Sequence, residues 1–227
     1  NADASTQLTI LNTATNAPVA LTGVPAGDIN GVRFNRDETK IAFTVVSDTS
    51  PADIFVADLA TGAATRLTKS LNPAIDETML VEAEVVRYKS FDGLDIPAIL
   101  FKPKTASAGA PGPAIVDVHG GPGGQNRRGY AAMYQHLVNH GYAVLRVNNR
   151  GSSGYGKTFY HMDDKKHGEV DLDDVVYGKK YLQTLDWVQK DKIAVMGGSY
   201  GGYMVAAALA FRPDEFDAGI DIFGVTN

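Results

Sequence analysis

Residues 194–204 read AVMGGSYGGYM, and they place Ser199 inside a frame of glycines at the end of an apolar run. The segment GGSYG matches the pattern G-x-S-x-G, with an apolar strand expected before it and a helix expected over 200–211. A side chain that projects from such a strand-to-helix turn strains the backbone, and glycines on either side leave room for it. The context predicts a nucleophilic serine, with the N–H of Tyr200 directed at a developing oxyanion.

Apolar strands alternate with helices from about Glu82 onward. The expected strands are EVVRYKS (84–90), DIPAILFKP (95–103), PAIVDVH (113–119), YAVLRVN (142–148), KIAVMG (192–197) and AGIDIFG (218–224). Helices are expected near 129–140, 170–187 and 200–211. This order predicts an α/β fold with a largely parallel sheet covered on both faces, and with Ser199 directly after the fifth of six strands.

The first eighty residues contain no helical periodicity. Short alternating strands are expected at QLTILN (7–12), GVRFN (31–35), KIAFTVV (40–46), DIFVADL (53–59) and ATRLT (64–68). The segment LTILNTATNAPVALT (8–22) also aligns with IFVADLATGAATRLT (54–68) at a constant offset of 46 residues, with Asn16 opposite Gly62 at the turn. A repeat of about 40–50 residues built from short strands is typical of β-propeller blades. The alternative is a chance resemblance between two strand–turn–strand units.

A glycine-rich loop, HGGPGG at 119–124, follows the third strand of the expected α/β sheet. A loop at this place supplies the second N–H group of an oxyanion hole in hydrolases with a G-x-S-x-G serine, and Gly121 is the expected donor. His119 stands at the end of the strand. An orienting role for His119 is favoured over a role as the base.

Four segments together resemble the prolyl oligopeptidase family of serine peptidases, in the branch of the acylaminoacyl peptidases and dipeptidyl peptidases. They are VDVHGGPGG, GYAVLRVNNRGSSGYG, KIAVMGGSYGGYM and FDAGIDIFGVTN, and the resemblance runs from about residue 30 to the C-terminus. It implies a β-propeller ahead of an α/β-hydrolase domain. It further implies Ser199 as nucleophile, Tyr200 and Gly121 as oxyanion-hole donors, and Arg150 and Gly151 in a loop at the pocket rim.

Two domains follow from these patterns. Residues 1–80 are expected to be the C-terminal portion of a β-propeller, about one and a half blades. Residues 81–227 are expected to be the N-terminal part of an α/β-hydrolase domain that lacks its last strands.

The catalytic partners of Ser199 are missing from the sequence. The family orders its triad as serine, aspartate, histidine, yet all five histidines precede Ser199. The three later aspartates, Asp214, Asp217 and Asp221, stand around a helix end or inside a strand. We therefore expect a truncated chain, with the triad aspartate and histidine beyond Asn227, and expect the chain alone to be inactive.

Three other motifs suggest different chemistry. GSSGYGKT at 151–158 fits the phosphate-binding pattern G-x-x-x-x-G-K-[ST], but a charged segment follows instead of an apolar-faced helix. His136 and His140 have the i, i+4 spacing of zinc ligands, without the glutamate or a third ligand. The acidic segment at 161–174 departs from the calcium-loop template, and it is interpreted as a solvated helix start. No metal and no cofactor are expected.

Composition narrows the possible partners. A net charge of −5 and a pI near 5.5 argue against nucleic acid and anionic membranes, and no apolar run is long enough to span a bilayer. There is no cysteine, which leaves the cellular compartment open. The leading hypothesis is a serine peptidase that hydrolyses short peptides through an acyl-enzyme, and the sequence leaves open whether it is a homo-oligomer. The alternatives are an esterase or lipase, a P-loop nucleotide binder, and a non-catalytic propeller-type interaction module.

Overall fold

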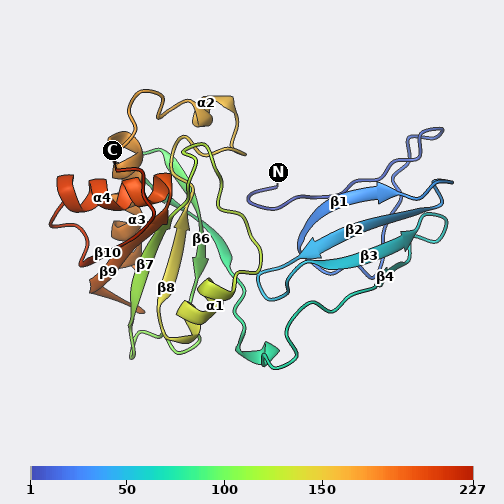
Figure 1. Cartoon of the computed structure of the whole chain (residues 1–227), viewed down its shortest axis with the longest axis horizontal. Coiled ribbons are helices and arrows are strands. Elements are labelled where there is room, and N and C mark those ends of the chain that lie inside the picture. Colours follow the sequence, from blue (N-terminus) through green and yellow to red (C-terminus); the bar gives the residue numbers. More distant parts are fainter. Residues whose placement is uncertain (1, 227) are drawn as a thin grey trace. The chain divides into compact units, whose positions relative to one another are not determined.

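The computed structural model describes residues 2–226, which fold into two compact units (Figure 1). Unit 1 comprises the residues up to Glu82 together with Arg128–Ala132. Unit 2 comprises Ala83–Arg127 and the residues from Met133 onward.

Unit 1 is built on one antiparallel sheet with the strand order β1-β2-β3-β4. Its strands are β1 (Asp28–Phe34), β2 (Lys40–Val46), β3 (Asp53–Asp58) and β4 (Ala64–Arg66), and a short 3-10 helix, η1 (Glu77–Met79), follows them. Alternate residues of β2 and β3 are buried in a common apolar cluster: Ile41, Phe43, Val45, Phe55 and Ala57. The period-2 pattern of the sequence therefore marks the buried face of this sheet.

The strand predicted at 7–12 is wrong. In this part of the described chain the backbone forms a single antiparallel bridge, between Leu11 and Pro18, and no longer ladder. The segment nevertheless packs apolar side chains, Leu8 and Ile10, against the cluster of unit 1. The apolar alternation therefore marks a partly buried face, although it does not produce a strand.

The 46-residue repeat reappears in the geometry of two turns. Asn12 Oδ1 accepts the N–H groups two and three residues further on, at 2.9 and 3.1 Å. Asp58 Oδ1 accepts the corresponding pair at 3.0 and 3.0 Å. Each turn then passes through a residue with positive φ, Asn16 at 57° and Gly62 at 70°. The same turn is thus built twice, 46 residues apart in the sequence.

Unit 2 is an α/β structure with one mixed sheet, in the strand order β10-β9-β7-β8-β6-β5. Its strands are β5 (Glu84–Lys89), β6 (Asp95–Phe101), β7 (Gly112–Val118), β8 (Ala143–Val147), β9 (Val188–Gly198) and β10 (Ala218–Ile222). The strands from β10 to β8 pair in parallel, whereas β6 pairs antiparallel with both β8 and β5. The parallel character is confirmed for four strands, and the expected hairpin at 84–103 supplies the antiparallel edge.

Helices lie on both faces of this sheet, α1 on one and α3 with α4 on the other (Figure 1). The four helices are α1 (Ala132–Asn139), α2 (Lys157–Tyr160), α3 (Val170–Gln183) and α4 (Tyr200–Phe211). Val116 and Val118 of β7 point toward α3 and α4, while Asp117 between them accepts the Tyr134 hydroxyl of α1 at 2.8 Å. The alternation along β7 therefore decides which helix each side chain meets.

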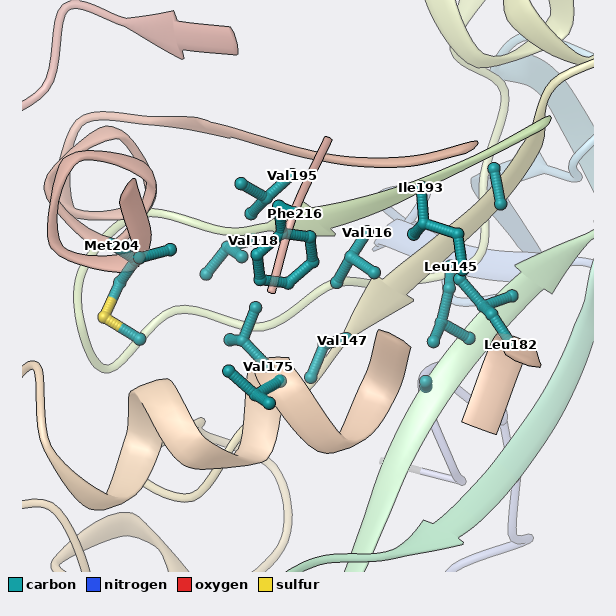
Figure 2. Packing of buried hydrophobic residues seen from close by; sticks show 14 of the residues in the cluster. Val116, Val118, Leu145, Val147, Val175, Leu182, Ile193, Val195, Met204 and Phe216 are labelled. Atoms are coloured by element: carbon teal, nitrogen blue, oxygen red, sulfur yellow. The ribbon is translucent and has the colours of Figure 1, made fainter. Parts of the chain in front are cut away.

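The core of unit 2 lies between the sheet and the pair α3 and α4. Figure 2 shows Val175 and Leu182 of α3, Met204 of α4, and Val116 and Leu145 of the sheet as members of one buried cluster. Each fully buried aliphatic side chain contributes about 1.5–3 kcal/mol relative to an exposed one. This packing holds the carboxyl ends of β7 and β9, and the loops that leave them, in fixed positions. Across residues 2–226, the model shows no helix with the length and hydrophobicity that a bilayer crossing requires.

Candidate active site

Ser199 occupies the sharp turn between β9 and α4. Its φ of 55° and ψ of −117° lie outside the regions that L-residues normally adopt, at a cost of about 1–3 kcal/mol. The Ser199 N–H donates to the carbonyl of Ile222 in β10 at 3.1 Å, and the Ser199 carbonyl accepts the first helical bond from Tyr203 at 3.1 Å. The residue is exposed, so the surrounding backbone holds its hydroxyl out toward solvent.

Two glycines make this turn sterically possible. A Cβ on Gly201 would overlap the carbonyl oxygen of Val118 and lie 2.9 Å from its carbonyl carbon. A Cβ on Gly197 would lie 2.8 Å from the Gly201 Cα. The start of α4 therefore packs directly on the end of β7, which no larger residue would permit.

The loop after β7 meets the turn after β9. A Cβ built on Gly120 would lie 3.3 Å from Ser199 Cβ and 3.8 Å from Ser199 Oγ. Gly121 is the next residue in this loop, and Tyr200 is the first residue of α4, whose first-turn N–H groups have no partner within the helix. The structure thus brings together the two segments that carry the predicted nucleophile and its two predicted donors, and the roles of these residues stay predictions.

His119 holds the loop that contains Gly121. Its Nδ1 lies 2.8 Å from the Gly120 carbonyl oxygen, so Nδ1 carries a proton and donates, while Nε2 lies 2.8 Å from Ser152 Oγ. Burial lowers the pKa of the His119 imidazole, which favours the neutral ring. Both ring nitrogens are engaged, and no hydrogen bond joins a histidine to the Ser199 hydroxyl within residues 2–226. This arrangement suits an orienting residue rather than a base for Ser199.

The side chain of Arg150 is buried in an ion-pair network. Its guanidinium is buried and bonds Asp174 at 2.8 and 2.9 Å and Asp92 at 2.9 and 3.1 Å. It also lies over the ring of Phe91, 4.7 Å from the centroid. The predicted place of Arg150 and Gly151 in a loop at the pocket rim stays a prediction.

Only glycine fits at position 151, because the carboxyl group of Asp163 occupies the place of a Cβ. Gly151 has a φ of 92°, and any Cβ there would collide with the carboxyl group of Asp163. The same contact argues against phosphate binding at 151–158, because a carboxylate at the first glycine of the motif repels a phosphate. The motif also leads into α2, a helix of only four residues.

The interpretation of the acidic segment as a solvated helix start is wrong for three of its members. Asp163, Asp171 and Asp174 are buried, and burial raises the pKa of each carboxyl group. Asp174 is paired with Arg150, and Asp163 lies 3.4 Å from His167 Nε2. The charged residues suggested exposure, whereas Arg150 reaches Asp174 and the Tyr200 hydroxyl reaches Asp171 inside the fold. Asp163 Oδ2 is buried without a hydrogen-bond donor among the described residues.

Asp171 joins the acidic segment to the serine turn. Its Oδ1 accepts the N–H groups of Gly168, Glu169 and Leu172 at 2.8, 3.1 and 2.9 Å. Its Oδ2 accepts the hydroxyl of Tyr200. Sequence patterns carried no signal for this contact, since the two residues are 29 positions apart in the chain.

The surface beside Ser199 is apolar. Phe223 and Val225 follow β10 with 82% and 60% of their surfaces exposed. The Val225 N–H lies 3.4 Å from the Ser199 carbonyl oxygen, which ties this segment to the turn. The sequence indicated only a strand here, because nothing in its pattern showed that the strand would end next to the serine.

Fold and site together define an α/β protein in which a serine projects from a strand-to-helix turn beneath a glycine-rich loop. Comparison with known proteins agrees with this class. Residues 129–227 match the model of the prolyl oligopeptidase family. Dipeptidyl aminopeptidase BIII of Pseudoxanthomonas mexicana is 34% identical over 214 residues, which cover 91% of this chain and 31% of that protein.

Solved structures agree over almost the whole chain. A puromycin-hydrolyzing peptidase of Mycobacterium tuberculosis superposes with a TM-score of 0.89 at 25% identity, over 99% of this chain and 35% of that one. The acylaminoacyl peptidase of Pyrococcus horikoshii gives a TM-score of 0.81 at 28% identity, over 99% and 35%. The chain belongs to the prolyl oligopeptidase family, and it spans about a third of the length of these relatives.

Proposed function

We propose that this chain carries the nucleophile and the oxyanion hole of a serine peptidase. The observation that supports the proposal most directly is the meeting of the exposed, strained Ser199 with the Gly120 loop. Ser199 Oγ attacks the carbonyl carbon of a peptide bond. The N–H groups of Tyr200 and Gly121 stabilise the negative charge that develops on its oxygen. The amine leaves, and water then hydrolyses the acyl-enzyme.

The reaction requires a base for the Ser199 hydroxyl. Within residues 2–226 the histidine rings nearest the turn are engaged elsewhere, His119 with Gly120 and Ser152, and His167 with Asp163 and the Tyr200 ring. We therefore assign the triad histidine and aspartate to residues of the full-length protein outside this chain. The chain alone is then inactive, because an unassisted serine hydroxyl keeps its proton.

Short peptides and aminoacyl amides are the proposed substrates. The relatives are named as a dipeptidyl aminopeptidase, an acylaminoacyl peptidase and a puromycin-hydrolyzing peptidase. The exposed Phe223 and Val225 beside Ser199 offer an apolar surface to the residue that donates the carbonyl. Residues 1–80 are proposed to form part of a β-propeller, on the strength of the turn repeated at Asn12 and Asp58.

Reaction of the full-length protein with a fluorophosphonate probe tests the proposal. Labelling and peptidase turnover should both disappear in Ser199→Ala, and labelling that persists in this variant would contradict the assignment. An esterase on the same fold is separated by comparing peptide-amide and ester substrates of the same acyl group. Turnover of the ester alone would favour the esterase.

A further inference from the structure

The side chain of Tyr200 is held as firmly as its backbone. Its ring packs edge-on against His167, with ring centroids 5.6 Å apart, and at a tilt against Tyr203, with centroids 5.4 Å apart. Its hydroxyl donates to Asp171, a carboxylate with no exposed surface. The residue is thus fixed at the ring and at the hydroxyl as well as at the start of α4.

Both carboxylate oxygens of Asp171 accept hydrogen bonds. An ionised carboxylate offers about four lone-pair sites, and this one receives three backbone N–H groups and one phenol. The three N–H groups come from the loop before α3 and from its first turn, so Asp171 is itself anchored to its own helix. The contact therefore connects two rigid elements, the start of α3 and the start of α4.

We propose that Asp171 is a positioning residue for the oxyanion hole, which it stabilises by accepting the Tyr200 hydroxyl and so fixing the direction of the Tyr200 N–H. This inference rests on the proposed peptidase function. Ser199 sits in a strained conformation, and such strain persists only where neighbouring contacts leave no alternative. Tyr200 follows the strained residue directly, and its side chain contacts Asp171, His167 and Tyr203. Rotation of the first turn of α4 would break a buried hydrogen bond.

Tyr200→Phe in the full-length protein is the direct test. It removes the hydroxyl but keeps the ring, and Asp171 keeps its three backbone donors, so the start of α3 is expected to remain folded. Loss of a whole oxyanion-hole donor lowers kcat by about 10²–10³. Tyr200→Phe keeps the Tyr200 N–H and only loosens its position, so kcat should fall about tenfold. KM should stay nearly unchanged, because the hydrogen bond from this N–H to the oxyanion is made in the transition state.

Tyr134→Phe is the matched control. Tyr134 also donates to a buried carboxylate, Asp117, at 2.8 Å, but this pair lies between α1 and β7, on the face of the sheet opposite α4. Both variants lose one phenol–carboxylate bond and should lose similar stability, whereas only Tyr200→Phe should lose kcat. An equal fall of kcat in the two variants, or no fall in either, overturns the proposal.

Two further measurements separate positioning from general damage. Asp171→Asn keeps an oxygen for the backbone donors and should retain more activity than Asp171→Ala. The double variant of Asp171→Asn and Tyr200→Phe should have the same kcat as Tyr200→Phe alone, because the effects of residues that act through each other are not additive. A peptide aldehyde, which forms a tetrahedral adduct with the serine, should bind Tyr200→Phe about tenfold more weakly. Full additivity, or unchanged aldehyde affinity, contradicts the inference.

Ser199→Ala distinguishes this inference from the function on which it rests. If Ser199→Ala retains turnover, the proposed function is wrong, and the Asp171 role falls with it. If Ser199→Ala is inactive while Tyr200→Phe matches Tyr134→Phe, the function stands and only the role of Asp171 is refuted.

Discussion

Gly120 and Ser199 approach so closely that a methyl group on the Gly120 Cα would lie 3.3 Å from Ser199 Cβ and 3.2 Å from the Gly198 carbonyl oxygen. The loop after β7 thus forms one wall of the space into which the serine hydroxyl projects. Because the contact joins two loops that leave neighbouring parallel strands, the sheet itself sets the distance between the proposed nucleophile, Ser199, and the loop that carries Gly121.

Gly120→Ala should reduce the reactivity of Ser199 without unfolding the protein. The added methyl must displace its neighbours by a few tenths of an ångström, which shifts the donors that face the oxyanion. We expect the rate of fluorophosphonate labelling in the full-length protein to fall about tenfold, a part of the loss expected for a missing donor. Gly109→Ala is the control, since nothing lies within 4 Å of a Cβ at that position. Equal labelling rates in the two variants would show that the Gly120 contact is not restrictive.

His119→Ala should lower kcat about tenfold, because it frees the peptide between Gly120 and Gly121. In a trans peptide the N–H points away from the carbonyl, so the bond from His119 Nδ1 to the Gly120 oxygen also sets the direction of the Gly121 N–H. His119→Asn places an amide donor near the position of Nδ1 and should recover part of the rate. Steady-state kinetics of the two variants check this, and identical rates in both would remove the orienting role.

The burial of His119 also predicts a pH dependence of stability. Its pKa is lowered in the fold, so below its ordinary value of 6.5 the unfolded chain takes up a proton that the folded chain does not. The free energy of unfolding should therefore decrease from about pH 7 to about pH 5.5. The decrease should be smaller in His119→Asn when thermal unfolding is followed at both pH values. An identical pH dependence in the variant would mean that other groups cause it.

Arg150→Leu should destabilise unit 2 strongly. It leaves Asp174 buried without its cation, and breaking a buried pair in this way costs about 3–5 kcal/mol. Asp92→Asn removes the other partner, whose side chain is 40% exposed, and should cost less than about 1 kcal/mol. Urea unfolding of the variants gives the comparison, and equal losses would contradict the difference in burial. Asp174→Asn in the Arg150→Leu background should restore part of the stability.

Asp53 should make unit 1 sensitive to acid. Burial acts to raise its pKa, but hydrogen bonds from Thr68, Ser70 and Arg66 outweigh that effect and lower the pKa from 3.8 to about 2. A lowered pKa stabilises the folded state above the unfolded value, and this contribution is lost as the pH falls from about 4 to about 2. Asp53→Asn should be less stable near neutral pH and should show a flatter acid profile. Hydrogen exchange of the β3 amides measures both effects, and an unchanged acid slope would count against Asp53.

Local sequence patterns were sufficient to predict most strands and helices of unit 2. All six of its strands, the long helix at 170–183 and the helix at 200–211 lie where alternation and helical periodicity indicated, because each buries one face or both faces in the core. The position of Ser199 followed from the same local signals, a strand, a glycine frame and a helix. In unit 1 the strand at 7–12 failed, because apolar alternation reports a buried face and cannot report whether a neighbouring strand is available to pair with it.

The environment of the charged residues depended on distant parts of the chain. Asp174 is buried because Arg150 and Ser90 reach it from 24 and 84 positions away, and Asp171 is buried beneath Tyr200. An acidic segment has the same sequence whether its carboxylates are bound by water or by distant hydrogen-bond donors. The sequence therefore favoured a solvent-exposed helix start. The strand-to-helix turn that carries Ser199 can thus be predicted from a dozen neighbouring residues, since steric limits on one turn are local. The groups that hold its surroundings in place are known only after the chain has folded, since hydrogen bonding and burial are set by partners far away in sequence.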